Sequence, residues 1–305
     1  MTGPVFVGRF EVGSPEWHQA RAGALGGSEV AAACNLSTFE SAFSLWHRKA
    51  GMTGPIEDNN ELYWGRRLEP LLREEFARRH PEYLVESDLG MWRSGEHPYM
   101  LASPDALLYR HSGLPEKRSV PEIWEGKTAR IRDNWGPDGS DDVPVYYRAQ
   151  GLWNCMVWGA PRVHYGVLFA GSEYAEFTVE YDEMEGAILR ERGRLFVQSL
   201  LDGVRPEIDG HERTYETVRE LAPGIEDYDI ELPGDIALPY LEAVKAYKEA
   251  KAAHRMHTAR VADAIGDGRR GCWIGDPIAR RQRKGNADPH LVFISEPREK
   301  QVITA

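Results

Sequence analysis

The sequence lacks the features of membrane-spanning, secreted and cysteine-rich metal proteins. Its 305 residues contain no run of about 18 apolar residues, the length that a transmembrane helix needs. The first eight residues show no basic stretch followed by a long apolar one, so we expect no signal peptide. The three cysteines, Cys34, Cys155 and Cys272, are far apart and odd in number. They predict free thiols in a reducing cytoplasm, without a disulfide framework or metal-ligand spacing.

A net positive charge is also missing. Lys and Arg number 37 against 48 Asp and Glu, which gives a formal net charge of −11. This balance argues against a protein that coats nucleic acid through a generally basic surface. An acidic enzyme can still bind DNA if its basic residues line one groove and its acids gather at a metal site. The apolar fraction of 42% in so long a chain is enough for a substantial buried core.

The order of the local signals predicts a mixed α/β, or α+β, fold. Helix signals dominate up to residue 80, and strand signals, one further helix, a β-hairpin and another helix follow. A sheet interrupted by one helix is typical of a central mixed sheet flanked by helices. Pro70 lies inside a helix expected over 60–80 and should kink it or reset its start. The ranges expected after residue 80 are 83–128 for the strands, 144–158 for the helix, 163–181 for the hairpin and 182–201 for the last helix.

Three segments are expected along the chain. Residues 1–208 hold the mixed core, and residues 209–237 are acidic and punctuated by Pro and Gly, as is typical of a linker or a wrapping segment. Residues 238–305 begin with a long amphipathic helix and end in a small β extension with a basic run over 280–284. An arm that contacts duplex DNA or a neighbouring subunit would gain salt-sensitive phosphate contacts from this run. The plainer alternative is a helical decoration that packs on the core.

Two short segments carry the chemical signal. Asp105 follows Ser103 and Pro104, and Glu125-Gly126-Lys127 lies downstream in a strand-like run. Alternate residues of a strand share a face, so Glu125 and Lys127 project to the same side. With Asp105 opposite them, two carboxylates and one ammonium can hold a divalent cation and activate a water against a phosphodiester.

Each of these three residues, taken alone, is explained more simply as a solvated surface group. The set is more specific, because Asp105 lies between apolar stretches and a carboxylate between buried strands needs a partner or a cation. Lys127 would orient the attacking water and help to deprotonate it, or stabilise the charge that develops on the phosphorane.

Here the chain resembles the PD-(D/E)XK nuclease superfamily, whose pattern is Asp, a spacer and Glu-x-Lys. More narrowly, it is similar to the phage lambda exonuclease and YqaJ-type viral recombinase family. The likeness covers about residues 14–200 and rests on five segments in consistent order. Besides the two above, these segments are 25–32, 64–70 and 146–151. The resemblance implies a restriction-endonuclease-like core, with a central mixed sheet flanked by helices, and metal-dependent cleavage of DNA.

The resemblance adds a third carboxylate to the site. On helical spacing Glu69 shares a face with Arg73, which alone favours an exposed, salt-bridged acid. Glu69 matches the helix carboxylate of the family, which binds metal together with the residues at Asp105 and Glu125. The main-chain carbonyl of Gly126 also ligates in the superfamily. A third carboxylate makes a site with two Mg²⁺ or Mn²⁺ ions feasible.

The resemblance also assigns the helix over 144–158 to the wall of the active site. Gln150 lies three residues after Tyr147, so both can face one side of this helix. Gln150 would lie near the nucleophilic water or the scissile phosphate, and Tyr147 would contact DNA. A surface Gln and a half-buried Tyr are the plainer alternative.

Arg21, Ser28 and Ser103 form a second predicted cluster. Ser28 follows two glycines and is expected to cap a short helix, whose N-terminus can bind an anion through free N–H groups. Similar positions in the lambda-type exonucleases form a pocket for the terminal 5′-phosphate of the strand being degraded. Arg21 would supply a fixed positive charge with forked donors. Simple N-capping is the alternative role for Ser28.

Together these features predict a Mg²⁺- or Mn²⁺-dependent 5′→3′ double-strand exonuclease of a phage-type recombination system. It would degrade one strand from a 5′-phosphorylated end and leave a 3′ single strand for a single-strand-annealing protein. The resemblance further implies a homo-oligomeric ring, expected to be a trimer, that encircles duplex DNA. The expected location is the cytoplasm of a bacterial host, for a phage or prophage protein that has no membrane partner.

Two other functions fit the same core. One is a structure-selective or restriction-like endonuclease, and the other is a DNA-binding assembly module with a degenerate nuclease core. The intact set of Asp105, Glu125 and Lys127 argues against the second. The lack of four suitably placed cysteines argues against an iron–sulfur nuclease of the same superfamily.

Overall fold

The computed structural model describes residues 3–111 and 120–294. The chain divides into two compact units, Met1–Gly224 and Ile225–Ala305. The first unit holds every residue that the sequence predicts for the active site. No helix in the described ranges is both long and apolar enough to cross a lipid bilayer.

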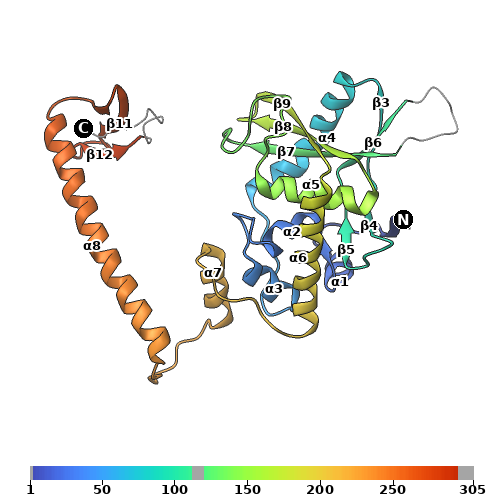
Figure 1. The fold of residues 1–305 in the computed structure, drawn as a ribbon. Coiled ribbons are helices and arrows are strands. Elements are labelled where there is room, and N and C mark those ends of the chain that lie inside the picture. Colours follow the sequence, from blue (N-terminus) through green and yellow to red (C-terminus); the bar gives the residue numbers. More distant parts are fainter. Residues whose placement is uncertain (1–2, 112–119, 295–305) are drawn as a thin grey trace. The chain divides into compact units, whose positions relative to one another are not determined.

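A five-stranded mixed sheet lies in the first unit, with helices on both sides (Figure 1). Its strand order is β3-β6-β7-β8-β9, with β7 parallel to β8 and the other neighbours antiparallel. Residues 122–125 of the central strand β7 are all buried, as a strand covered on both faces requires. This is the mixed sheet that the sequence predicts. The strands are β3 (Tyr83–Glu86), β6 (Ala106–Arg110), β7 (Glu122–Ala129), β8 (Arg162–Phe169) and β9 (Glu173–Glu180).

A second sheet of the first unit brings the N-terminal region next to the segment that carries Asp105. It has four strands in the order β1-β4-β5-β2, and β2 pairs with β5 in parallel. Gly26, which precedes the next helix, lies opposite Leu101. The chain therefore passes from β5 to Asp105 close to the start of that helix. The strands are β1 (Val5–Gly8), β2 (Leu25–Gly26), β4 (Met91–Arg93) and β5 (Met100–Ala102).

Helices α4 (Asn60–Arg79) and α5 (Val145–Trp158) cover opposite faces of the five-stranded sheet (Figure 1). Phe76 of α4 packs in a small cluster around Trp124 of β7. Trp153 of α5 belongs to the main core on the other face. The central strand is thus held between two helices that both carry predicted site residues.

Pro70 does not divide α4, which runs as one helix through it. The expectation that Pro70 resets the start of the helix is therefore wrong. Pro70 removes one helical hydrogen bond. The buried side chains of Leu72 and Phe76, two and six residues further on, hold the helix against the sheet. That packing offsets the loss of the bond.

Helix α5 approaches the sheet closely at Gly151. A Cβ atom at this position would lie 2.6 Å from Cγ1 of Val163 and would overlap the hydroxyl of Tyr165. That hydroxyl donates a hydrogen bond of 2.7 Å to the carbonyl of Tyr147. Glycine therefore lets α5 lie directly on β8, which brings the neighbouring Gln150 close to β7.

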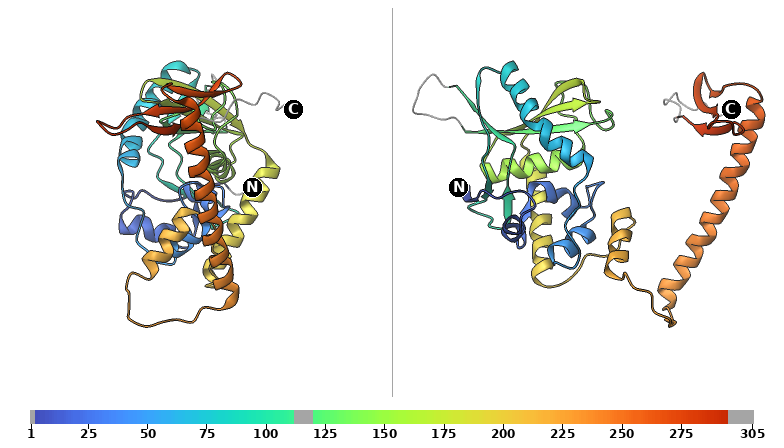
Figure 2. Two further views of the ribbon diagram at one scale, coloured as in Figure 1. Left: turned by 90° about the vertical axis from the view of Figure 1, so that its left-hand side faces the viewer. Right: turned by 180° about the vertical axis from the view of Figure 1, so that it is seen from behind.

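A further layer of helices packs against α5 on the side away from the sheet (Figures 1 and 2). Both α2 and α6 contact α5, and α3 contacts α2 and α6. The short helix α1 starts as the sequence predicts, with the hydroxyl of Ser14 accepting from the N–H of Trp17. These helices are α1 (Pro15–Arg21), α2 (Gly27–Ala33), α3 (Ala42–Lys49) and α6 (Glu183–Leu201).

The segment predicted as a linker, 209–237, contains helix α7 (Glu212–Leu221), which packs on α3. The hydroxyl of Thr217 donates to Ser44 at 2.9 Å, and that of Thr214 donates to Ser41 at 2.6 Å. All four hydroxyl side chains are buried. The composition of 209–237, acidic and punctuated by Pro and Gly, predicted a linker or a wrapping segment, and the first unit extends into it as far as Gly224.

The second unit consists of a long helix and a small sheet. Helix α8 (Gly234–Ile265) begins four residues earlier than the sequence suggests, and none of its residues is buried. Its C-terminal end contacts the sheet β10-β11-β12, which is antiparallel throughout. The strands are β10 (Arg270–Trp273), β11 (Asp276–Gln282) and β12 (His290–Phe293).

The close approach of α5 to the sheet can be tested with Gly151→Ala. We expect the added methyl group to lower the free energy of unfolding by about 1–3 kcal/mol, because Val163 and Tyr165 must move to admit it. The matched control is Gly65→Ala in α4, where a Cβ atom meets nothing within 4 Å. That change should stabilise the protein by about 1 kcal/mol, since Ala favours helix over Gly. Urea unfolding of both variants measures the difference, and equal effects would contradict the packing at Gly151.

Candidate active site

Strand β7 divides the site residues between its two faces. Glu125 and Lys127 face α5, and the Lys127 ammonium donates to Oε2 of Glu125 at 2.8 Å. The intervening Gly126 faces α4, where a Cβ atom would lie 3.4 Å from Cγ of Glu69. The expectation that Glu125 and Lys127 share one side is confirmed. Glu69 lies near the strand from the other side.

Asp105 reaches β7 from the turn between β5 and β6. Its Oδ2 accepts a hydrogen bond of 2.9 Å from the N–H of Gly126. The pairing of Ala106 with Trp124 sets this position, because it places the preceding residue beside the middle of β7. Asp105 therefore meets the Glu125–Lys127 segment at its main chain, as the spacing of the two motifs predicts.

Helix α5 supplies two amides that hold the carboxylate of Glu125. Gln150 donates to its Oε2 and Asn154, one turn further on, donates to its Oε1, both at 2.8 Å. Tyr147 lies on the same side, with its ring centroid 5.2 Å from Nζ of Lys127. Gln150 and Tyr147 were predicted to face the site, but Asn154 was not. Its spacing of four residues from Gln150 was the signal that could have found it.

The three carboxyl groups carry an excess of negative charge in a buried place. Burial raises the pKa of Glu69 to about 7, and repulsion from Asp105 adds to this against the pull of Arg73. Burial also raises the pKa of Glu125 to about 7, with Lys127 lowering it and Asp105 raising it. The pKa of Asp105 is raised by its burial, despite Lys127 and the N–H of Gly126.

Lys127 is the ammonium that balances part of this charge. Burial disfavours its protonated form, but Glu125 and then Asp105 outweigh burial and raise the pKa of Lys127. The amine is therefore a fixed positive charge at neutral pH. Arg73 contributes a second cation and lies 3.2 Å from Oε1 of Glu69.

The carboxylate groups suit a divalent metal, although the described residues form no preformed coordination site. Within the described ranges, no three His, Cys, Asp or Glu side chains are already arranged around a metal position. Asp105, Glu125 and Glu69 supply carboxylate oxygens, the ligands that Mg²⁺ and Mn²⁺ prefer. A bound cation would lower the pKa values of these groups and so offset the effect of burial and of mutual repulsion. Oε2 of Glu125 accepts two hydrogen bonds and Oε1 accepts one, so one lone pair of Oε1 remains for a cation.

An open hollow of about 330 Å³ gives access to the acidic residues. Glu69, Asp105 and Arg73 line it together with Ser103 and Trp17. A polar group that enters this hollow meets two carboxylates of raised pKa and one guanidinium. The hollow is therefore the place where a substrate would reach the site.

A second hollow of about 340 Å³ is lined by three cations, Arg21, Arg48 and Lys49. Trp17 lines this hollow as well as the first, and the guanidinium of Arg21 lies 4.3 Å from its ring centroid. Arg21 also donates to the hydroxyl of Ser28 at 3.2 Å. Its Nε is buried and has no hydrogen-bond partner among the described residues, so one donor is left for an anion.

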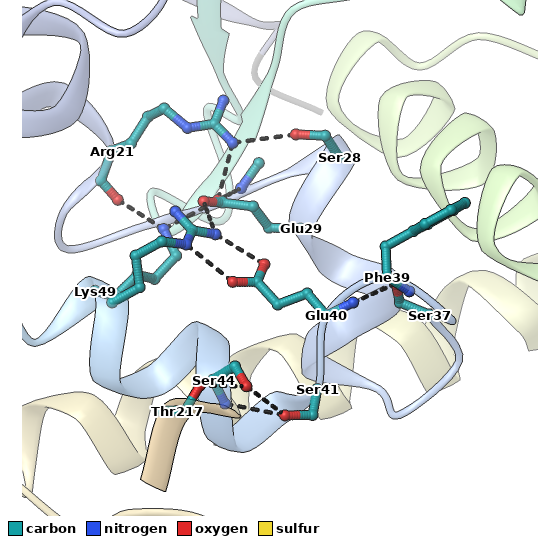
Figure 3. Close-up of polar contacts among 12 residues, drawn as sticks. Arg21, Ser28, Glu29, Ser37, Phe39, Glu40, Ser41, Ser44, Lys49 and Thr217 are labelled. Carbon is teal, nitrogen blue, oxygen red and sulfur yellow. Dashed lines mark hydrogen bonds and ion pairs between the residues drawn. The ribbon is translucent and has the colours of Figure 1, made fainter. Parts of the chain in front are cut away.

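Glu29 holds these three cations together (Figure 3). Its Oε2 lies 3.0 Å from Arg21 and 2.9 Å from Lys49, and its Oε1 lies 3.6 Å from Arg48. Arg48 in turn makes two hydrogen bonds of 2.9 Å to Glu40. We call Arg21, Glu29, Glu40, Arg48 and Lys49 the Glu29 network.

The pKa of Glu29 shows how strongly this network favours the carboxylate. Burial alone would raise the value, but Arg21, Lys49 and Arg48 lower the pKa to about 2. The N–H of Gly26 contributes a hydrogen bond of 2.9 Å to Oε2. Sequence reasoning missed Glu29, Arg48 and Lys49, because their contacts join α1, α2 and α3 and follow no local spacing.

Two details of the predicted phosphate cluster differ from expectation. Ser28 does not cap α2, which starts at Gly27 with Gly26 in the cap position. Its hydroxyl is therefore free to accept from Arg21. Ser103 lines the hollow of Asp105 and Glu69, whereas Arg21 lines the other one. The structure thus joins Arg21 with Ser28 and places Ser103 with the acidic residues.

Comparison with known proteins relates part of the chain to a protein family. Residues 16–161 match the model of the YqaJ-like viral recombinase domain. This part of the chain is similar to the YqaJ-like viral recombinase domain. It contains Asp105, Glu125, Lys127 and Gln150, together with the whole Glu29 network. Helix α8 and the small sheet of the second unit lie outside it.

One curated relative and two solved structures describe the extent of the similarity. The chain is 23% identical over 214 residues to the uncharacterized protein YqaJ of Bacillus subtilis (strain 168), covering 69% of this chain. The match spans 64% of the relative, less than two thirds of its length. An alkaline exonuclease from Laribacter hongkongensis matches 68% of this chain and 100% of its own, with 17% identity and a TM-score of 0.47. A SOX–DNA complex matches 63% of this chain and 68% of its own, with 11% identity and a TM-score of 0.38.

The Glu29 network can be tested with Glu29→Gln. This change leaves three buried cations without their shared counter-charge, so we expect it to remove about 3–5 kcal/mol of unfolding free energy at pH 7. Because the folded pKa of about 2 lies below the ordinary 4.5, the wild type keeps the full contribution above pH 4.5 and loses it as the pH falls toward 2. The variant should lose less stability over that interval. Urea unfolding at several pH values measures both effects.

The control for this test is Glu75→Gln. The pKa of Glu75 is also lowered to about 2, through hydrogen bonds from Arg78 and Arg79, but these pairs lie at the surface. Solvent screens such pairs, so we expect little change in stability. A Glu29→Gln variant as stable as the wild type at pH 7 would contradict the role of the network.

Proposed function

We propose that this chain is a metal-dependent deoxyribonuclease that degrades one strand of duplex DNA in the 5′→3′ direction. The observation that carries the proposal is the meeting of Asp105, Glu125 and Lys127 around the main chain of Gly126. Glu69 approaches the same strand from α4. Buried carboxylates that repel one another, next to a fixed ammonium, suit the binding of a divalent cation and a phosphate.

In this proposal Asp105, Glu125, Glu69 and the carbonyl of Gly126 hold one or two Mg²⁺ or Mn²⁺ ions. When bound, the metal supplies an activated water and charge compensation at the phosphate. The protein contributes the fixed positions of the carboxylates on β7, α4 and the turn before β6. It also places Arg73 at the acidic hollow, where a guanidinium can bind the phosphate group of a DNA strand.

Lys127 and Gln150 have the second set of roles. Lys127 stays protonated at neutral pH and therefore acts as an electrostatic group that orients the attacking water and stabilises negative charge at the phosphate. Gln150 donates to Glu125 and keeps its carboxylate turned toward Lys127. The second N–H of the Gln150 amide would hydrogen-bond the attacking water. Tyr147, beside Lys127, contacts the DNA strand.

Arg21, Ser28 and Ser103 bind the 5′-phosphate of the strand that is degraded. Arg21 and Ser28 are already hydrogen-bonded to each other, and the buried Nε of Arg21 has a proton left to donate. Ser103 lies with Asp105 in the neighbouring hollow, and Trp17 lines both. A terminal phosphate at Arg21 would place the following phosphate near the acidic residues. This arrangement favours an exonuclease over the alternative of an endonuclease with the same core.

The biological setting follows from the family. A viral recombinase domain suits an enzyme that prepares DNA ends, so we propose a phage or prophage protein of the bacterial cytoplasm. Its product, a 3′ single strand, would pass to a single-strand-annealing protein. A homo-oligomeric ring, proposed to be a trimer, would let the acidic exterior coexist with a basic channel around the duplex.

The proposed roles predict the effect of two substitutions. Lys127→Ala and Asp105→Asn should each lower the rate of duplex degradation with Mg²⁺ by at least about 100-fold, because each removes charge that stabilises the reacting phosphate or its metal. Asp105→Asn keeps an acceptor for the N–H of Gly126 and so preserves the fold. Release of acid-soluble nucleotides measures the rate. The control is Lys245→Ala on the exposed surface of α8, and a Lys127→Ala enzyme of wild-type rate would refute the assignment.

The proposed end dependence predicts which DNA is degraded. Linear duplex with 5′-phosphate ends should be degraded about tenfold faster than the same duplex with 5′-hydroxyl ends, since a charged hydrogen bond to Arg21 is lost. Closed circular duplex should be spared, and a chelator should stop all degradation. Arg21→Gln should abolish the preference for the phosphate while leaving the circle intact. Cleavage of the circle at a similar rate would favour the endonuclease instead.

A further inference from the structure

The small sheet of the second unit has a charge opposite to that of the whole chain. Between the start of β10 and the end of β12 the sequence has five Arg or Lys residues and two Asp, whereas the chain carries a net charge of −11. This segment lies outside the recombinase domain, so the active site described above does not account for it.

One face of this sheet lies against the end of α8. Gly271 and Ala279 are opposite each other in the β10–β11 pair, and Ala279 is buried. A Cβ atom on Gly271 would lie 2.9 Å from Cδ1 of Ile265 and 3.8 Å from Cγ1 of Val261. Arg281 is on this covered face as well and donates to the carbonyl of Gly266. The neighbours of these residues along the strands must therefore face outward.

The outward face brings two arginines together. Arg270 lies directly opposite Arg280 in the antiparallel register, and both are exposed. Gln282 lies opposite His290 on the same face, one strand further. Like charges directly opposite each other destabilise an antiparallel pair. Within the described part of the chain, no carboxylate forms an ion pair with Arg270 or Arg280 that would offset this repulsion.

We propose that this face binds the phosphate backbone of DNA. Arg270 and Arg280 form its centre, and Arg283 and Lys284 follow β11 as two further exposed cations. A set of four exposed cations suits an extended polyanion better than a single small anion. The forked donors of arginine match phosphate oxygens, and a bound phosphate removes the repulsion across the strands. The site is separate from the proposed nuclease centre and does not depend on catalysis.

The test measures DNA binding by the full-length protein in buffer with EDTA, so that the DNA stays intact. Fluorescence anisotropy of a labelled 30-base-pair duplex, and of the matching single strand, is recorded over a series of NaCl concentrations. We expect Arg270→Gln/Arg280→Gln to bind duplex about tenfold more weakly at low salt. The slope of log K against log[salt] should fall by about 1.8 for duplex and about 1.4 for the single strand, for two lost phosphate contacts.

Two variants separate the sheet from general charge. Arg255→Gln/Arg260→Gln removes the same two charges from exposed positions of α8 and should keep the wild-type slope. Arg270→Lys/Arg280→Lys keeps the charges and should also keep the slope. The Gln variant should unfold no more easily than the wild type, because it loses only repulsion. A structural role for the two arginines would instead lower the melting temperature.

Three results would overturn the proposal. The first is wild-type affinity and slope in Arg270→Gln/Arg280→Gln for both forms of DNA. The second is an equal loss in the α8 control, which would indicate a general charge effect. The third is loss of binding to phosphatidylserine vesicles with unchanged DNA binding, which would assign the face to a membrane surface. These binding measurements do not depend on nuclease activity, so they remain valid even if the wild-type protein proves to have none.

Discussion

A carboxylate with no exposed surface, Glu125, is the group on which the arrangement of the site depends. An isolated buried carboxylate is costly, so Lys127, Gln150 and Asn154 must all reach it. This demand fixes the rotation of α5 over β7. It also holds the side chain of Lys127 beside Glu125. The close approach at Gly151 makes the contact possible. The burial that accompanies this packing raises the pKa of Glu125 to about 7.

The Glu29 network also stabilises a buried carboxylate through its partners, but there the cations outnumber the carboxylate. There one carboxylate faces three cations and keeps a pKa of about 2, whereas at β7 one ammonium faces several carboxyl groups. Trp17 lines both hollows, so a region that favours anions adjoins one that favours cations. Under the proposed function, the two hollows would offer different surroundings to successive phosphates of a DNA end. Helices α1, α2 and α3 are tied together by this network rather than by apolar packing alone.

Sequence reasoning succeeded where short-range geometry decides the outcome. The alternation of a strand places Glu125 and Lys127 on one face, and helical spacing places Gln150 with Tyr147. It failed where contacts join distant elements. Glu29 owes its role to neighbours that only the fold supplies, and no local spacing distinguishes it from an ordinary polar residue. Asn154 lies one helical turn after Gln150, but only the fold shows that both amides meet Glu125. Ser28 was misplaced by two residues, because glycine can occupy the cap position of a helix as well as serine.

Helix α7 has a mechanical consequence for the chain. It is the last helix before the division at Gly224, and it is joined through Thr214 and Thr217 to Ser41 and Ser44 at the start of α3. These four buried hydroxyl groups therefore fix the last helix before the division to the first unit. The far end of α3 carries Arg48 and Lys49. A shift of this helix along its axis would therefore change the distances from both cations to Glu29.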